Sequence, residues 1–163
     1  QQFSVQTGEV QSSGIEFDLQ GEIFPGLSAI VNYATTNVEI TEDENPENVG
    51  NRLSGHARHM TSAWLTYNFG QSSIADGFGV SLGYQYQNDR STWGLGAEGE
   101  SELPDYFRLD GGVFWQKKNI RIQANINNIT DEYLFSGSAA FGTPYWQTEP
   151  GINGRLAVTY NFN

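Results

Sequence analysis

Seven stretches of this 163-residue chain alternate apolar and polar residues, and this period-two pattern constrains the fold more than any other feature. In the last stretch, Leu156, Val158, Tyr160 and Phe162 fall on one face, and small or polar residues fill the other. Successive side chains of a β-strand point to opposite sides, so the pattern indicates strands with one apolar and one polar face. Because the gaps between stretches also alternate short and long, the sequence predicts an all-β, transmembrane antiparallel β-barrel segment.

Each predicted strand is long enough to cross the hydrocarbon layer of a membrane at a tilt. The long gaps are expected on the extracellular side and the short turns, including 25–26 and 117–118, on the periplasmic side. The strands are expected at residues 15–24, 27–35, 58–69, 78–87, 104–116, 120–127 and 155–162. The long gaps span about residues 36–55, 88–103 and 130–150.

The fourth predicted strand separates its two faces most clearly. Phe78, Val80, Leu82, Tyr84 and Tyr86 are expected to face lipid, while the glutamines between them face the lumen. Charged residues on the inner face would be costly in a dry core unless paired, so they indicate a wet or plugged lumen. These inner charges are Glu16, Asp18, Glu22, Arg108, Asp110 and Arg121.

Seven strands are an odd number, whereas bacterial single-chain barrels have an even one. Residues 3–9 could supply an eighth strand that closes a small barrel. Alternatively, the seven strands belong to a larger barrel and leave two open edges, whose unpaired backbone groups cannot remain in lipid. We expect the second arrangement, in which residues 15–24 do not pair with 155–162.

The composition narrows the class of protein further. Hydrophobic residues make up 37% of the chain, and no run of about eighteen apolar residues exists to form a membrane helix. The formal net charge of −11 disfavours nucleic acid as a partner. Acidic residues cluster in the long gaps, as solvated loops do. No secretion signal precedes Phe3, so a barrel reading implies a processed or truncated N-terminus.

Catalytic and metal-binding patterns are not found, so we expect neither an enzyme nor a covalently bound cofactor. His56 and His59 are three residues apart, and strand geometry would point them to opposite faces, which disfavours a shared metal. The acidic run 42–47 lacks the spacing and glycine of a calcium loop.

Four segments resemble the C-terminal region of TonB-dependent siderophore receptors, most closely the ferrichrome-receptor-like branch. They are residues 6–17, 59–67, 125–133 and the closing 154–162. The resemblance implies a 22-stranded barrel with an N-terminal plug, of which residues 1–163 would be the last seven strands and last three surface loops. Family members commonly end on the aromatic residue, whereas Asn163 follows Phe162 here.

The resemblance also implies a function and partners. The receptor would lie in the bacterial outer membrane and take up a ferric siderophore with energy from TonB, which would act through an N-terminal region absent from this sequence. Other partners would be the remaining barrel strands, the plug, outer-membrane lipid and the barrel assembly machinery. That machinery would capture the final strand through Gly154, Leu156, Val158, Tyr160 and Phe162.

The third long gap is rich in aromatic residues, which can pack on the planar and apolar parts of a ligand. In the resembled family, loop aromatics help to bind the ferric siderophore, so Phe141, Tyr145 and Trp146 are candidate ligand-binding residues. Membrane-interface or loop packing is the alternative for these side chains. Asn127-Asn128 and Asp131 are expected to tie down the start of this loop through their side chains.

Two other functions remain open from the sequence. One is a free-standing eight-stranded outer-membrane barrel that anchors or adheres. The other is a soluble carbohydrate-binding β-sandwich, which the aromatic and acidic composition allows. The long lipid-like strand faces and the three long loops on one side count against the sandwich.

Overall fold

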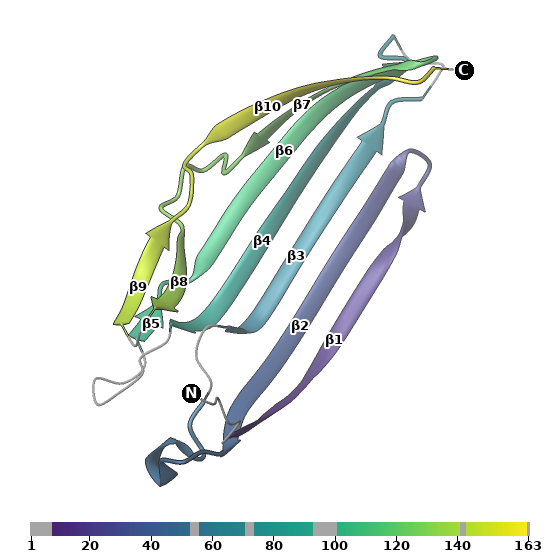
Figure 1. Ribbon diagram of the computed structural model, residues 1–163. Coiled ribbons are helices and arrows are strands. Elements are labelled where there is room, and N and C mark those ends of the chain that lie inside the picture. Colours follow the sequence, from purple (N-terminus) through teal and green to yellow (C-terminus); the bar gives the residue numbers. More distant parts are fainter. Residues whose placement is uncertain (1–7, 53–55, 71–73, 93–100, 141–142, 163) are drawn as a thin grey trace.

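The computed structural model describes residues 8–52, 56–70, 74–92, 101–140 and 143–162. Within them, seven long strands form one antiparallel sheet in which each strand pairs with the next long strand in the sequence (Figure 1). No helix in the described ranges is long and apolar enough to span a membrane. The long strands are β1 (Glu9–Phe24), β2 (Leu27–Glu42), β3 (Ala57–Asn68), β4 (Phe78–Thr92), β6 (Tyr106–Lys117), β7 (Ile120–Asn127) and β10 (Asn153–Tyr160).

The shorter elements gather at the end of the sheet from which the three long connections leave (Figure 1). They are a 3-10 helix, η1 (Pro46–Asn48), the short strand β5 (Ser101–Leu103), and a separate hairpin of β8 (Phe135–Ala140) and β9 (Thr143–Thr148). The short turns and the C-terminus lie at the opposite end. We call the first end the loop end and the second the turn end. The expected alternation of short and long connections is therefore confirmed.

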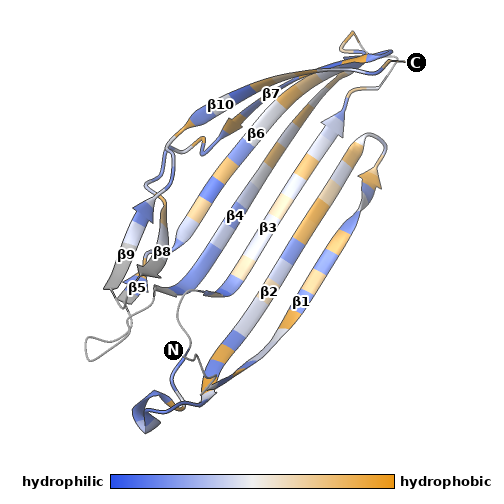
Figure 2. Cartoon of the chain, viewed as in Figure 1, coloured by the Kyte–Doolittle hydropathy of each residue, from blue (hydrophilic) through white to orange (hydrophobic). Residues whose placement is uncertain are grey.

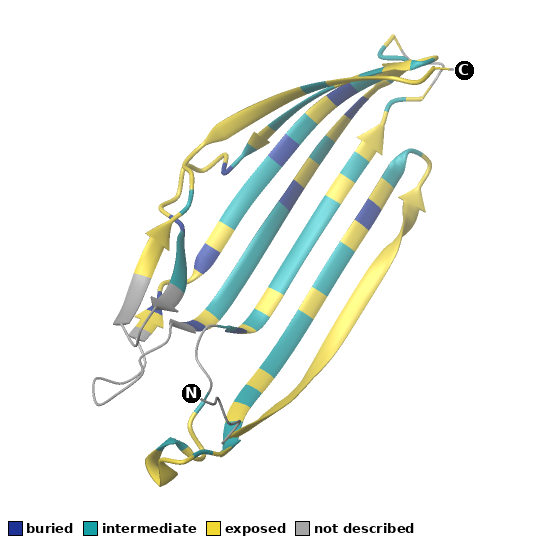
Figure 3. Cartoon of the chain, viewed as in Figure 1, coloured by how far each residue is buried: buried dark blue, intermediate teal, exposed yellow. Residues whose placement is uncertain are grey.

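The sheet is open at both sides. In the described residues, β1 pairs only with β2, and β10 pairs only with β7. Both edge strands are exposed along nearly their whole length, whereas the strands between them carry partly buried positions (Figure 3). The expectation that β1 and β10 do not close a small barrel is confirmed.

Hydrophobic and hydrophilic residues alternate along the long strands (Figure 2). Because successive side chains of a strand point to opposite sides, the two faces of the sheet differ in polarity. On the face that we call outer, Leu65 lies opposite Leu82, and Val80 lies opposite Val113. All four side chains are exposed, although they are aliphatic. A single-layer sheet with such a face is suited to contact with lipid.

The other face, which we call inner, is polar. Asp18 and Asn32 are hydrogen-bonded across β1 and β2, and Arg108 forms a 3.0 Å ion pair with Asp110 on β6. The register places all six expected inner charges on this face, opposite polar, small or aliphatic partners. The six are Glu16, Asp18, Glu22, Arg108, Asp110 and Arg121.

The strand boundaries at the loop end correct the sequence-based ones. β1 begins at Glu9 rather than residue 15, β2 ends at Glu42 rather than 35, and β4 ends at Thr92 rather than 87. The extension of β4 is polar on both faces, and in that of β2 the apolar Val38 and Ile40 lie on the inner face, so the outer face loses its apolar pattern. The backbone ladder nevertheless continues, with Glu9 opposite Glu42. The third long gap was expected to be a loop but contains the β8–β9 hairpin. Residues 1–7, most of the candidate eighth strand, lie outside the described part of the chain.

Two glycines of β4 make room on the inner face for aromatic rings of the neighbouring strands. A Cβ atom added at Gly83 would lie 2.0 Å from Cε3 of Trp64 on β3. One added at Gly79 would lie 2.1 Å from Cζ of Phe114 on β6. The rings therefore occupy the space that a side chain of β4 would fill, and they tie β4 to both neighbours.

We predict that Gly83→Ala destabilises the protein by about 1–3 kcal/mol, because the Trp64 ring must leave its position. The matched control is Gly21→Ala on β1, where an added Cβ meets nothing within 4 Å. The midpoint of urea unfolding in lipid vesicles measures both. Equal midpoints for the two variants would contradict the packing described for Gly83.

Candidate functional site

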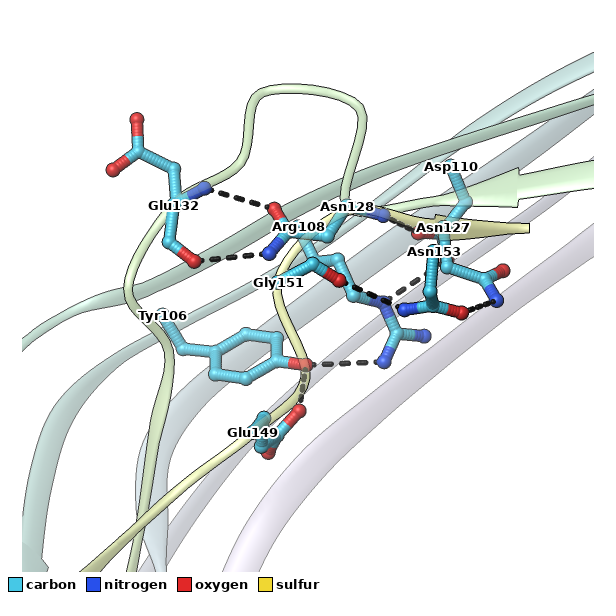
Figure 4. Close-up of polar contacts among 9 residues, drawn as sticks. All are labelled: Tyr106, Arg108, Asp110, Asn127, Asn128, Glu132, Glu149, Gly151 and Asn153. Carbon is cyan, nitrogen blue, oxygen red and sulfur yellow. Dashed lines mark hydrogen bonds and ion pairs between the residues drawn. The ribbon is translucent and has the colours of Figure 1, made fainter.

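The third long connection, between β7 and β10, is fixed at its start by Asn128. This side chain is only 1% exposed. The backbone N–H of Asn128 donates to Oδ1 of Asp110 at 2.9 Å. Its amide nitrogen donates to the carbonyl of Glu132 at 2.9 Å, and its amide oxygen accepts from the Glu132 N–H at 3.0 Å (Figure 4). The expected role of Asn128 in tying down the loop is confirmed.

The end of the same connection is tied to its start. The N–H of Ile152 donates to Oδ1 of Asp131 at 2.8 Å. A Cβ atom on Gly151 would lie 2.7 Å from that oxygen, so this close approach favours glycine. Asp131 adopts a positive φ of 53°, a conformation that aspartate tolerates better than most residues. The role expected for Asp131 is therefore also confirmed, whereas Asn127 bonds instead to Asn153, across to β10.

A row of polar contacts continues from this anchor along β6 (Figure 4). Arg108 donates to Asp110 at 3.0 Å and to the hydroxyl of Tyr106 at 3.1 Å. The Tyr106 hydroxyl in turn donates to Oε2 of Glu149 at 3.0 Å. The Glu149 N–H closes the base of the β8–β9 hairpin by donating to the carbonyl of Leu134 at 2.9 Å.

Arg90, near the loop end of β4, holds the other side of the hairpin. Its guanidinium donates to the carbonyl of Pro104 at 3.0 Å and to the carbonyl of Phe135 at 2.7 Å. It also lies over the ring of Tyr106, 5.2 Å from the ring centre. Sequence reasoning missed Arg90, because its partners are backbone carbonyls that no side-chain pattern marks.

The three candidate ligand-binding residues all fall in this connection. Phe141 lies outside the described residues. Tyr145 belongs to β9, but its side chain is not among those described. The Trp146 ring is 46% exposed and packs against Phe135, with ring centres 5.4 Å apart. Trp146 is therefore available for contact at the loop end, and its role in ligand binding stays a prediction.

The final strand carries the residues expected to guide assembly. Leu156 and Val158 lie opposite Ala124 and Ile122 of β7, on the outer face. Tyr160 packs edge-on against Phe162, with ring centres 4.7 Å apart. Gly154 lies opposite Ile126. The placement provides an apolar strand face with an aromatic pair at the turn end.

No cluster of metal-ligating side chains is found within the described residues. His59 contacts Tyr33, with 3.2 Å between Nδ1 and the phenol oxygen. Arg52 of the first long connection and Arg58 of β3 both pair with Asp89, and Arg52 also donates to the Asp89 carbonyl. These contacts connect the first loop to β4 and do not touch the hairpin.

We predict that Asn128→Ala destabilises the protein by about 1–3 kcal/mol, since it removes the two part-buried hydrogen bonds between this side chain and the Glu132 backbone. It should also increase protease cleavage within 130–150. Asn127→Ala is the matched control, because it removes one exposed hydrogen bond to Asn153. If both variants resisted protease equally well, the anchoring role of Asn128 would be wrong.

Known receptors are similar to this chain in sequence along nearly its whole length. The ferrioxamine B receptor of Salmonella typhimurium (strain SL1344) is 24% identical over 158 residues, which cover 94% of this chain and 22% of that receptor. The ferrichrome receptor FcuA of Yersinia enterocolitica is 26% identical over 161 residues, covering 95% of this chain and 20% of the receptor. The chain thus spans about a fifth of the length of these curated relatives.

Solved structures agree on the fold. The crystal structure of the siderophore receptor PiuA from Acinetobacter baumannii matches with a TM-score of 0.73 and 24% identity, over 94% of this chain and 22% of that one. The sequence model of a family described as TonB dependent receptor-like, beta-barrel, matches residues 1–129. Its members are transport receptors of the Gram-negative outer membrane rather than enzymes. Because the match covers most of the chain, the protein belongs to the TonB-dependent receptor β-barrel family.

Proposed function

We propose that this chain forms part of the barrel wall of an outer-membrane receptor that takes up a ferric siderophore with energy from TonB. The observation that carries the proposal is the family match over residues 1–129. Relatives named as ferrioxamine and ferrichrome receptors, similar along nearly the whole chain, support the substrate class. The lipid-like outer face and polar inner face are what a transport barrel requires.

In this proposal the chain supplies the last seven strands of a larger barrel. The exposed edges of β1 and β10 support it, because unpaired backbone groups in lipid cost several kcal/mol each and need partner strands. Further strands of the same receptor would pair with both edges. A plug would cover the inner face, where Glu16, Asp18 and Glu22 form no ion pair among the described residues.

The candidate ligand contact lies in the third long connection, which contains the β8–β9 hairpin. We assign it to Phe141, Tyr145 and Trp146, since aromatic rings at a pore mouth can pack on the apolar portions of a siderophore. The exposure of Trp146 at the loop end supports the assignment. The membrane interface is the alternative location for such rings.

The final strand would interact with the barrel assembly machinery before the receptor closes. The support is the exposed edge of β10 together with its apolar face and the Tyr160–Phe162 pair. An unpaired strand edge is a template for pairing with another chain.

Uptake of radioactive iron by cells that carry the whole receptor tests the proposal. We expect iron uptake from ferrioxamine B or ferrichrome that disappears when TonB is inactivated. Uptake of a non-ferric metal chelate alone would assign the receptor to a different substrate class. Uptake that persists without TonB would contradict the energised mechanism.

We further predict that Trp146→Ala raises the dissociation constant of the transported siderophore about tenfold, as loss of an aromatic binding residue does. Tyr67→Ala is the control, because this exposed aromatic residue lies on the outer face at the turn end. Titration of purified receptor by fluorescence quenching measures both constants. An unchanged dissociation constant in Trp146→Ala would contradict ligand contact and would favour the alternative, in which Trp146 lies at the membrane interface.

A further inference from the structure

Arg90 has an unusual position for a charged side chain in an otherwise open sheet. It is only 9% exposed, whereas most residues of the loop end are half-buried or exposed. Its hydrogen bonds go to the backbone carbonyls of Pro104 and Phe135. Burial of a charge is costly unless it is satisfied, so such a residue is expected to hold a specific arrangement of its partners.

The partners of Arg90 come from two separate parts of the chain, the segment that enters β6 and the start of β8. Pro104 lies between β5 and β6, Phe135 begins β8, and the Tyr106 ring on which the guanidinium lies belongs to β6. A planar guanidinium can donate in two directions and stack on an aromatic face at the same time. One side chain of β4 therefore joins the barrel wall to the first strand of the hairpin.

Tyr106 and Glu149 join the second strand of the hairpin to the same wall. Tyr106 is 4% exposed, and its hydroxyl donates to the Glu149 carboxylate just after β9. Leu134, which is 3% exposed, packs at the base of the hairpin, and its carbonyl accepts the Glu149 N–H. Both strands of the hairpin are thus held where they leave the wall.

We propose that Arg90, Tyr106 and Glu149 form a clamp that fixes the β8–β9 hairpin against the wall and so positions Trp146 for the ligand. The ligand part of this proposal rests on the proposed function. Arg90 acts as a positioning residue and does not contact the siderophore. A loop that is ordered before binding loses less conformational freedom when the ligand arrives, so the clamp raises affinity.

Distances between spin labels in the whole receptor test the clamp without any ligand. The chain contains no cysteine, so Gln147→Cys on β9 and Glu102→Cys on β5 give a defined label pair within it. Both positions are exposed. We expect a narrow distance distribution in the unsubstituted receptor and a broad one in Arg90→Gln. Arg90→Lys keeps the positive charge but loses the planar guanidinium that donates in two directions. Its distance distribution should be intermediate in width.

Two further variants make the comparison specific. Tyr106→Phe removes only the hydroxyl that reaches Glu149, and it should broaden the distribution less than Arg90→Gln does. Arg52→Gln is the matched control, because Arg52 pairs with Asp89 and does not contact the hairpin. An unchanged distribution in Arg90→Gln and Tyr106→Phe, or an equal broadening in Arg52→Gln, would overturn the clamp.

Binding of ferrioxamine B to the same variants tests the positioning role. We expect its dissociation constant to rise about tenfold in Arg90→Gln and to stay unchanged in Arg52→Gln. A broadened distance distribution in Arg90→Gln together with an unchanged dissociation constant would overturn the positioning of Trp146. The clamp itself would then still stand. If the unsubstituted receptor bound no ferrioxamine B, the result would count against the ligand part of the proposal and against ferrioxamine B as the transported siderophore. The label distances would still decide the clamp.

Discussion

The structure depends on backbone pairing in a solvent that cannot hydrogen-bond. Within lipid, each strand must donate and accept along its whole length, so a membrane-crossing sheet needs neighbours on both sides. The five strands between the edges of the sheet have neighbours on both sides, whereas the edge strands β1 and β10 have a neighbour on one side only. The two exposed edges are therefore the points at which the rest of a barrel must join. Because backbone groups make these hydrogen bonds, the side chains can differ between the two faces of the sheet, apolar on the outer face and polar on the inner face.

The loop end follows different rules, because water can satisfy its backbone. There, individual side chains fix the chain: Asn128 and Asp131 hold the third connection at its base, and Arg90 and Tyr106 hold the hairpin above it. Strand pairing and loop positioning thus depend on different kinds of interaction, the first on backbone ladders and the second on individual side chains. Such a division allows the loops of one family to recognise different ligands on a common wall.

How much the sequence could predict also differs between the two regions. Alternation located the seven strands, and residues 120–127 coincide with β7, because lipid imposes a polarity on every second residue. The extension of β2 to Glu42 escaped prediction, since its outer face is polar and its apolar residues, Val38 and Ile40, lie on the inner face. The β8–β9 hairpin escaped because the small residues of β8 carry no period and β9 contains Pro144, which disfavours a strand. Arg90 could not be recognised, since its carbonyl partners lie 14 and 45 residues away.

Thiol labelling along β4 in the intact outer membrane tests the central claim, that the faces of this sheet separate lipid from water. Single cysteines at Leu82, Tyr84, Gln85 and Gln87 would be treated with a small water-soluble maleimide. The account predicts reaction at Gln85 and Gln87 and protection at Leu82 and Tyr84, because lipid covers the outer face. Equal reaction at Leu82 and Gln85 would contradict it, since the strand would then have water on both faces.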